Sequence, residues 1–154
     1  MAIKALIFDL GGVLLEFNWE RYREDQSREG PIQPLWSVYE KLNPPLIELL
    51  AQMRPHYKFA TICNGGSREA MNRKFRLNEL VDLMVFDGEE GIAKPDAQIY
   101  QRTLLRLGIK PEEAVFVDDK LVNVAAARQL GMHSIHFQNT EQALAEIHRV
   151  LQNQ

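Results

Sequence analysis

The stretch KALIFDLGGVLLEF, residues 4–17, decides the expected fold of this chain. Its first part, residues 4–8, is a short apolar run that predicts a buried β-strand. The strand ends at Asp9, and the glycines at positions 11 and 12 let the chain turn away sharply. In an open parallel sheet, ligands bind beyond the carboxyl ends of the strands, so this stretch predicts a strand that delivers a carboxylate to a ligand site.

Strands and helices alternate along the rest of the chain. Further apolar runs predict strands at 57–63, 83–87, 114–118 and 133–137. The first expected helix has Asn43 as its cap and Pro44 and Pro45 in its first turn, and it ends before Pro55. Four further helices are expected from Ser67 to about Arg76, from Pro95 to Leu107, from beyond Asp119 to Leu130, and over 140–151. This alternation predicts an α/β protein with a Rossmann-like, five-stranded parallel sheet flanked by helices on both faces.

Residues 17–43 are the least regular part of the sequence and hold both tryptophans, Trp19 and Trp36. We expect one or two short helices and a loop there, forming a minimal cap or linker. The 154 residues fit one domain, 1–154, with this segment as an insertion.

Composition excludes several classes of protein. A net charge of −3 gives no basic footprint for nucleic acid. No apolar run approaches the length of a membrane span, and the first residues lead straight into a strand rather than a signal peptide. The one cysteine, Cys63, forms no disulfide within the chain and suits a reducing compartment. We therefore expect a cytoplasmic protein.

Polar residues stand at the ends of three predicted strands. The first strand ends at Asp9, the second at Cys63 and Asn64, and the fourth at the pair 118–119, both aspartates. Lys94 precedes the helix that follows the third strand. Parallel strands bring these ends to one rim, where crowded carboxylates repel unless a cation neutralises them, and oxygen ligands suit Mg²⁺.

Four motifs in this order resemble those of the haloacid dehalogenase superfamily. They are FDLGGVL (8–14), TICN (61–64), the lysine of GIAKP (91–95) and FVDDKLVNVAAARQLGM (116–132). The resemblance covers nearly the whole chain outside about 17–43. FDLGGVL is similar to the branch that contains sugar-phosphate phosphatases and the phosphatase domain of soluble epoxide hydrolase.

The resemblance implies a role for each matching residue. Asp9 would attack phosphorus and form an aspartyl-phosphate. Mg²⁺ would be held by Asp9, the backbone carbonyl of Gly11 and Asp119, with Asp118 acting behind them or through a water. Lys94 would neutralise Asp9 and the incoming phosphate.

The resemblance also places a phosphate site beside the nucleophile. Backbone amides around Leu10, Asn64 and Gly65 would hold phosphate oxygens, with Cys63 in the position of a phosphate-binding hydroxyl. Asn123 would orient Lys94 or Asp119 by hydrogen bonding.

Three features depart from the phosphatases of this family. Gly11 stands where an aspartate usually transfers protons, which predicts slow turnover because such catalysis contributes about 10²–10⁴-fold. Cys63 replaces a serine or threonine and is the weaker donor. The insertion at 17–43 is too short for a full helical cap, so the site should be open to a bulky substrate or covered by a partner subunit. Trp19 and Trp36 either line that opening or pack the short connection, and we favour packing.

Three hypotheses follow for the activity. The first is a Mg²⁺-dependent phosphatase, a phosphoric monoester hydrolase that acts through Asp9 on a phosphorylated small molecule or a larger phosphorylated substrate. The second is a degenerate member that only binds a phosphorylated ligand or a protein. The third is a 2-haloacid dehalogenase, which needs no metal and therefore leaves the acidic pair 118–119 unexplained.

Overall fold

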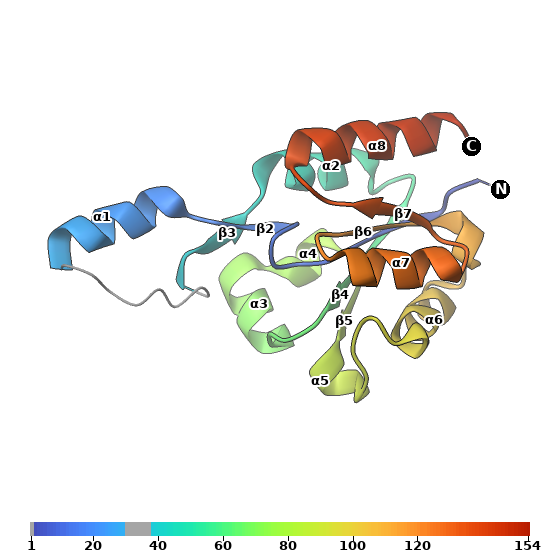
Figure 1. Cartoon of the computed structure of the whole chain (residues 1–154), viewed down its shortest axis with the longest axis horizontal. Coiled ribbons are helices and arrows are strands. Elements are labelled where there is room, and N and C mark those ends of the chain that lie inside the picture. The colour runs from blue at the N-terminus through green and yellow to red at the C-terminus, as the bar shows by residue number, and fades with distance from the viewer. Residues whose placement is uncertain (1, 30–37) are drawn as a thin grey trace.

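The computed structural model describes residues 2–29 and 38–154, and its centre is a sheet of five parallel strands (Figure 1). The order across the sheet is β5, β4, β1, β6, β7. The strands are β1 (Ala5–Phe8), β4 (Lys58–Cys63), β5 (Leu83–Phe86), β6 (Ala114–Asp118) and β7 (His133–His136). The predicted α/β, Rossmann-like fold with a five-stranded parallel sheet is confirmed.

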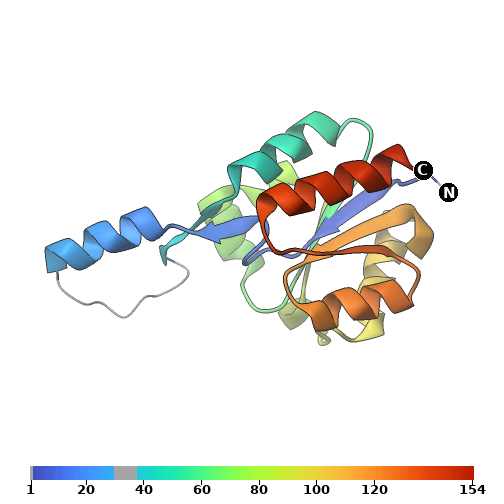
Figure 2. The same cartoon turned by 45° about the horizontal axis from the view of Figure 1, so that its top comes forward.

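Helices cover both faces of the sheet, as Figures 1 and 2 show. One apolar core lies under α2 (Pro44–Met53), α3 (Arg68–Phe75), α4 (Leu77–Leu80) and α8 (Thr140–Gln152). A second core lies under α6 (Ala97–Leu107) and α7 (Leu121–Gln129). The short α5 (Asp87–Glu90) and the 3₁₀ turn η2 (Pro111–Glu113) complete the connections. Because both faces are covered, the inner strands β4, β1 and β6 are mainly apolar, which explains why the sequence marks them so clearly, whereas the edge strand β7 (HSIH) is largely polar.

One predicted helix cap and two predicted boundaries differ from the structure for identifiable reasons. Asn43 stands at the cap position of α2, but its side-chain amide donates to the carbonyl of Val13 and to the hydroxyl of Thr140, so the predicted side-chain cap is wrong. The helix expected from Pro95 begins at Ala97, because the Asp96 carboxylate caps it. Likewise, the strand expected over 83–87 ends at Phe86, and Asp87 opens α5.

The segment 17–43 contains strands that the sequence did not reveal. β2 (Leu15–Phe17) and β3 (Glu40–Leu42) pair as an antiparallel ribbon, and α1 (Trp19–Glu29) projects beyond it, away from the sheet (Figures 1 and 2). Of the expected one or two short helices, one is present as α1, whereas the strands of the ribbon were not predicted. Trp36 lies outside the described residues.

Trp19 packs on the ribbon. Its ring lies 4.4 Å from that of Phe17 in an edge-to-face arrangement, and it also contacts Tyr22. Among the residues that the structure describes, Trp19 is not one of those that line the cavity around Asp9 at the ends of the strands. Separately, none of the described helices has both the length and the apolar character that a bilayer crossing requires.

Candidate active site

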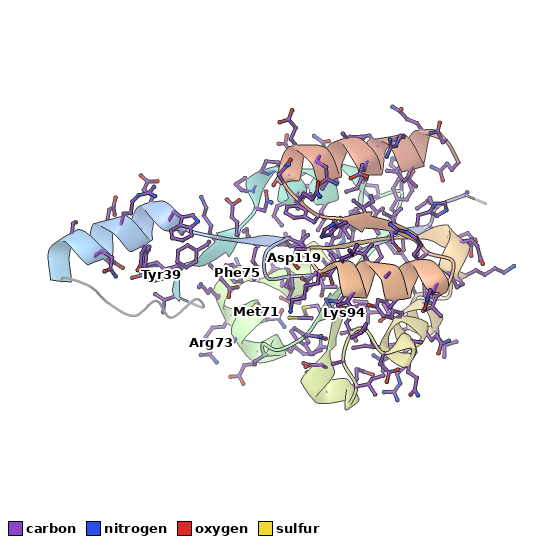
Figure 3. All side chains as sticks on the ribbon, in the orientation of Figure 1. Tyr39, Met71, Arg73, Phe75, Lys94 and Asp119 are labelled. Carbon is purple, nitrogen blue, oxygen red and sulfur yellow. The ribbon has the colours of Figure 1, made fainter. Side chains whose placement is uncertain are left out.

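The strand order brings the predicted polar residues to one rim. β1 lies at the centre of the sheet, between β4 and β6, so Asp9 emerges between the ends of those two strands. Strand order reverses at this point, because the chain runs from β1 to β4 and β5 on one side and then crosses to β6 and β7 on the other. Figure 3 labels Lys94 and Asp119, which lie near these strand ends.

Lys94 joins the first and fourth motifs through its buried ammonium group. Its Nζ donates to Asp9 Oδ1 at 2.8 Å, to Asp118 Oδ2 at 2.9 Å and to the carbonyl of Ile62 at 2.7 Å. These three bonds use all three hydrogens of the ammonium group. Lys94 therefore fixes one oxygen of Asp9 and holds two carboxylates that would otherwise repel each other.

Asp118 is fully buried, and its hydrogen bonds tie it to the surrounding chain. Its Oδ2 also accepts from Asn123 Nδ2 at 3.2 Å, and its Oδ1 accepts from the amide of Lys120 at 2.9 Å. Asn123 is held in turn, because its carbonyl accepts from the hydroxyl of Tyr100. Asp118 thus positions Lys94, while Asn123 positions Asp118 rather than Asp119.

Asp119 is the exposed member of the acidic group. Oxygens of Asp9, Asp118 and Asp119 all lie within 4.8 Å of one another. Within residues 2–29 and 38–154, nothing donates a hydrogen bond to the Asp119 carboxylate. Gly12, at φ +82°, leaves room for it, since a Cβ there would lie 2.6 Å from Asp119 Oδ2. Three carboxylates facing one lysine fit a hard divalent cation such as Mg²⁺.

Burial and crowding change the acidity of the central groups. Burial raises the pKa of Asp9 to about 7, and the charges of Asp118 and Asp119 add to this, while Lys94 opposes it. Burial lowers the pKa of Lys94, but Asp9 and Asp118 outweigh burial and hold it above its ordinary value. A cation bound here would favour the ionised form of Asp9.

The turn after β4 has its own hydrogen bonds. The Cys63 thiol donates to the carbonyl of Gly65, and burial together with the charge of Asp9 raises its pKa to about 12, so Cys63 is a neutral thiol. Asn64 exchanges two hydrogen bonds with the backbone of Lys94, which aligns the second and third motifs. The Gly65 amide donates to Asp87 Oδ1 at 2.9 Å, so this predicted phosphate donor is already engaged.

Two other predicted donors are free. Within the described ranges, the backbone amides of Leu10 and Asn64 donate to no protein acceptor. Asn64 lines the small cavity, of about 110 Å³, that contains Asp9 and Lys94, and Leu10 stands in the chain between the lining residues Asp9 and Gly11. Its lining consists of Asp9, Gly11, Cys63, Asn64, Lys94, Asp119, Lys120 and Asn123. Free amides at the rim of a cavity are suited to an anion.

The structure adds residues that the sequence analysis missed. The carbonyl of Ile62 holds Lys94, and Asp87 holds the turn through Gly65. Asp87 also follows a strand directly, as Asp9 does, so the same strand-end rule could have found it. The bond to Ile62 carries no signal in the sequence, because every residue has a carbonyl.

A family comparison agrees with this geometry. The model of the haloacid dehalogenase-like hydrolases matches residues 32–131, which is more than half of the chain. The chain therefore belongs to this family of hydrolases, as the four motifs indicated.

Curated relatives include phosphatases. The phosphorylated carbohydrates phosphatase of Thermotoga maritima is 32% identical over 134 residues, which cover 82% of this chain and 59% of the relative. Bifunctional epoxide hydrolase 2 of Sus scrofa is 30% identical over 118 residues, which cover 72% of this chain and 21% of the relative. In both cases the match spans less than two thirds of the relative's own length.

Solved structures share the fold. A protein of Porphyromonas gingivalis, described as a predicted HAD-like family hydrolase, matches with a TM-score of 0.75 at 22% identity and full coverage of both chains. A HAD family enzyme of Bacteroides thetaiotaomicron, in complex with magnesium and inorganic phosphate, matches with a TM-score of 0.71 at 17% identity, over 92% of this chain and 99% of that one. At these identities the likeness supports the fold alone.

Proposed function

We propose that this protein is a Mg²⁺-dependent phosphatase that hydrolyses phosphoric monoesters through a covalent aspartyl-phosphate on Asp9. The observation that carries the proposal is the joining of Asp9 and Asp118 by one buried lysine, with an Asp119 carboxylate oxygen within 4.8 Å that accepts no hydrogen bond from the described residues. The phosphatase among its relatives supports the same class of reaction.

Asp9 is suited to act as the nucleophile. Lys94 holds its Oδ1, while its Oδ2 accepts no hydrogen bond from the described residues. Attack by a carboxylate oxygen on phosphorus releases the alcohol, and water then cleaves the aspartyl-phosphate. Lys94 would limit the repulsion between Asp9 and the approaching phosphate, and it would keep Asp9 in a fixed orientation.

The metal would be held by Asp9, Asp119 and the carbonyl of Gly11, with Asp118 supporting them. When bound, magnesium would neutralise these carboxylates and stabilise the charge of the transferring phosphoryl group. The amides of Leu10 and Asn64 would receive phosphate oxygens. Gly65 would contribute its amide only after releasing Asp87, and the neutral thiol of Cys63 would add little.

The substrate would be a phosphorylated small molecule or a larger phosphorylated group, taken through an open rim. A partner subunit or a second copy could cover that rim, because α1 points away from it in Figure 1. A cytoplasmic location stays a prediction from the sequence.

The test is hydrolysis of 4-nitrophenyl phosphate with and without Mg²⁺, comparing the protein with Asp9→Asn. We expect Mg²⁺-dependent release of phosphate, and a loss on the order of 10⁴-fold or more in the variant, as for other enzymes that lose a nucleophile. Equal rates for the two proteins would contradict the proposal. Thermal melts of both proteins would show that the variant is folded.

A second candidate is a protein that binds a phosphorylated ligand without turnover. Gly11 favours it, because a residue without a side chain cannot transfer a proton. This candidate predicts binding of Mg²⁺ and phosphate together with no hydrolysis over a broad set of phosphate esters.

A further inference from the structure

Glu40 occupies an unusual place on the β2–β3 ribbon. In the ribbon, Glu40 pairs with Phe17, and Leu42 pairs with Leu15. Residues paired directly across two strands share a face, and so do alternate residues along a strand. Leu15 is buried and Leu42 packs against the core, so this face is directed inward. Glu40 is thus a carboxylate on an otherwise apolar inner face.

The opposite face of the ribbon shows what an ordinary pair looks like. Glu16 and Lys41 pair there at 3.4 Å, and both side chains are partly exposed. Within the described residues, by contrast, Glu40 takes part in no salt bridge or side-chain hydrogen bond. No hydrogen bond or salt bridge of its side chain to the described residues therefore accounts for a glutamate at this position, and we consider a role in the reaction.

The cavity next to the ribbon connects Glu40 with the catalytic rim. A space of about 200 Å³ is lined by Gly11, Gly12, Leu15, Glu16, Phe17 and Glu40. Gly11 also lines the smaller cavity that contains Asp9 and Lys94. Gly11, the position from which the usual proton-transferring side chain is missing, therefore lines both spaces.

The charge environment of Glu40 agrees with this location. Its charge makes a small contribution, weaker than that of Asp9, to the raised pKa of the Cys63 thiol, which lines the catalytic cavity, and Lys74 of α3 lowers the pKa of Glu40. Burial raises the pKa of Glu40, although Lys74 opposes the shift. A carboxyl group with a raised pKa keeps its proton to higher pH, so a larger fraction of it is in the form that can act as an acid.

We propose that Glu40 is the general acid and base of the reaction, supplied by the ribbon in place of a side chain at position 11. This inference rests on the proposed phosphatase function. In the first step an oxygen of Asp9 bonds to phosphorus, the bond from phosphorus to the leaving oxygen breaks, and that oxygen takes the proton of Glu40. The products are the free alcohol, the aspartyl-phosphate and the Glu40 carboxylate.

The second step restores the protein. The Glu40 carboxylate removes a proton from a water molecule, whose oxygen bonds to phosphorus while the bond between phosphorus and Asp9 breaks. Inorganic phosphate leaves, Asp9 is again a carboxylate, and Glu40 is again protonated. One water is consumed per ester, and no other reactant is needed.

The test compares Glu40→Gln with Glu16→Gln, which changes the neighbouring carboxylate of the same cavity. The substrates are phenyl phosphate, whose leaving group needs a proton, and 4-nitrophenyl phosphate, whose leaving group needs it much less. We expect Glu40→Gln to lower kcat/KM for phenyl phosphate by roughly 10²-fold or more, with a smaller loss for the nitrophenyl ester. Glu16→Gln should leave both values within a few-fold.

Rescue distinguishes proton transfer from a structural role. An added Cβ at Gly11 meets no atom within 4 Å, so the backbone leaves room for a side chain to begin there. We expect Gly11→Asp in the Glu40→Gln background to restore kcat/KM for phenyl phosphate at least tenfold. Unchanged rates in Glu40→Gln, an equal loss for both esters that Gly11→Asp does not restore, or a larger loss in Glu16→Gln would each overturn the role of Glu40. If the unmodified protein hydrolyses neither ester with Mg²⁺, the proposed function itself fails and this inference fails with it.

Discussion

The strand-end rim and the β2–β3 ribbon contain the same kind of ion pair at very different depths. On the rim, the side chains of Lys94 and Asp118 are 1% and 0% exposed. On the ribbon, those of Lys41 and Glu16 are 48% and 39% exposed. Water and salt screen the second pair, whereas the first depends on the protein alone for its partners.

This difference distinguishes the rim, where charged groups are buried together, from the ribbon, which connects β1 and α1 to the rest of the chain. The rim has paid a desolvation cost for charges that an apolar core could do without, which is typical of functional sites. The ion pair on the outer face of the ribbon has not, whereas Glu40 on the inner face is a partly buried carboxylate. Each prediction below compares a change on the rim or in the sheet with a matched change elsewhere.

The largest effect on stability should come from Lys94→Met. It leaves Asp9 and Asp118 buried without their cation, and removal of one partner of a buried pair costs about 3–5 kcal/mol. Lys41→Met on the ribbon should cost less than about 1 kcal/mol. Urea unfolding of both variants measures the two free energies of unfolding. Similar losses of unfolding free energy in the two variants would mean that Lys94 stabilises the protein no more than Lys41 does.

The pH dependence of stability should reveal Asp9. Its folded pKa of about 7 exceeds its ordinary value of 3.8, so between these values the folded protein retains a proton that the unfolded chain has lost. Without metal, the free energy of unfolding should therefore fall as pH rises from about 4 to about 7, by at most about 1.4 kcal/mol per pH unit from this group.

Asp9→Asn, which cannot titrate, provides the control for that slope. Its free energy of unfolding should fall less steeply over the same range, as measured by urea unfolding at several pH values. Mg²⁺ should stabilise the unmodified protein more at pH 7 than at pH 5, because the cation and the proton compete for the same carboxylates. Parallel slopes for the two proteins would contradict the assigned burial of Asp9.

The two adjacent glycines give a smaller but sharper contrast. Gly12→Ala puts a Cβ 2.6 Å from Asp119 Oδ2 at a positive φ, and should cost about 1–3 kcal/mol and weaken Mg²⁺ binding. Gly11→Ala meets no atom within 4 Å and should change stability by less than about 1 kcal/mol. Calorimetric titration with Mg²⁺ and thermal melts measure both effects. Equal behaviour of the two variants would remove the role assigned to Gly12 in making room for Asp119.

The smallest effect on stability is expected for a change in the arm, which is the projecting helix α1 (Trp19–Glu29). Trp19 is 53% exposed, so Trp19→Ala should lower the free energy of unfolding by less than about 1 kcal/mol. Phe116, fully buried against Tyr100 in the sheet, provides the contrast, since Phe116→Ala should cost about 3–5 kcal/mol. A large loss for Trp19→Ala would show that the arm stabilises the core more than its exposure indicates.

The sequence predicted the sheet well because burial on two faces leaves continuous apolar runs, as in AVFVD at 114–118. It predicted that the four motifs meet because strand ends share one edge. The ribbon was missed because LEF and EKL are three residues long and half charged, with no periodicity to detect. The pairing of Phe17 with Glu40 joins positions far apart in the chain, so the place of Glu40 was visible only in the fold.

Hydrogen bonds within the site were the other limit. That Asn123 holds Asp118, and that the Gly65 amide is engaged by Asp87, depends on side-chain directions that motif spacing does not determine. The residues that lie at the rim could be predicted from the sequence, but which of them hydrogen-bonds to which could not.

The most direct test of the central claim is a crystal structure with Mg²⁺ and beryllium fluoride, a mimic of the phosphorylated aspartate. We predict density for the fluoride joined to the carboxylate of Asp9 and a metal ion bound by Asp9 and Asp119. Beryllium fluoride absent from Asp9, with the metal bound elsewhere or not at all, would contradict the account.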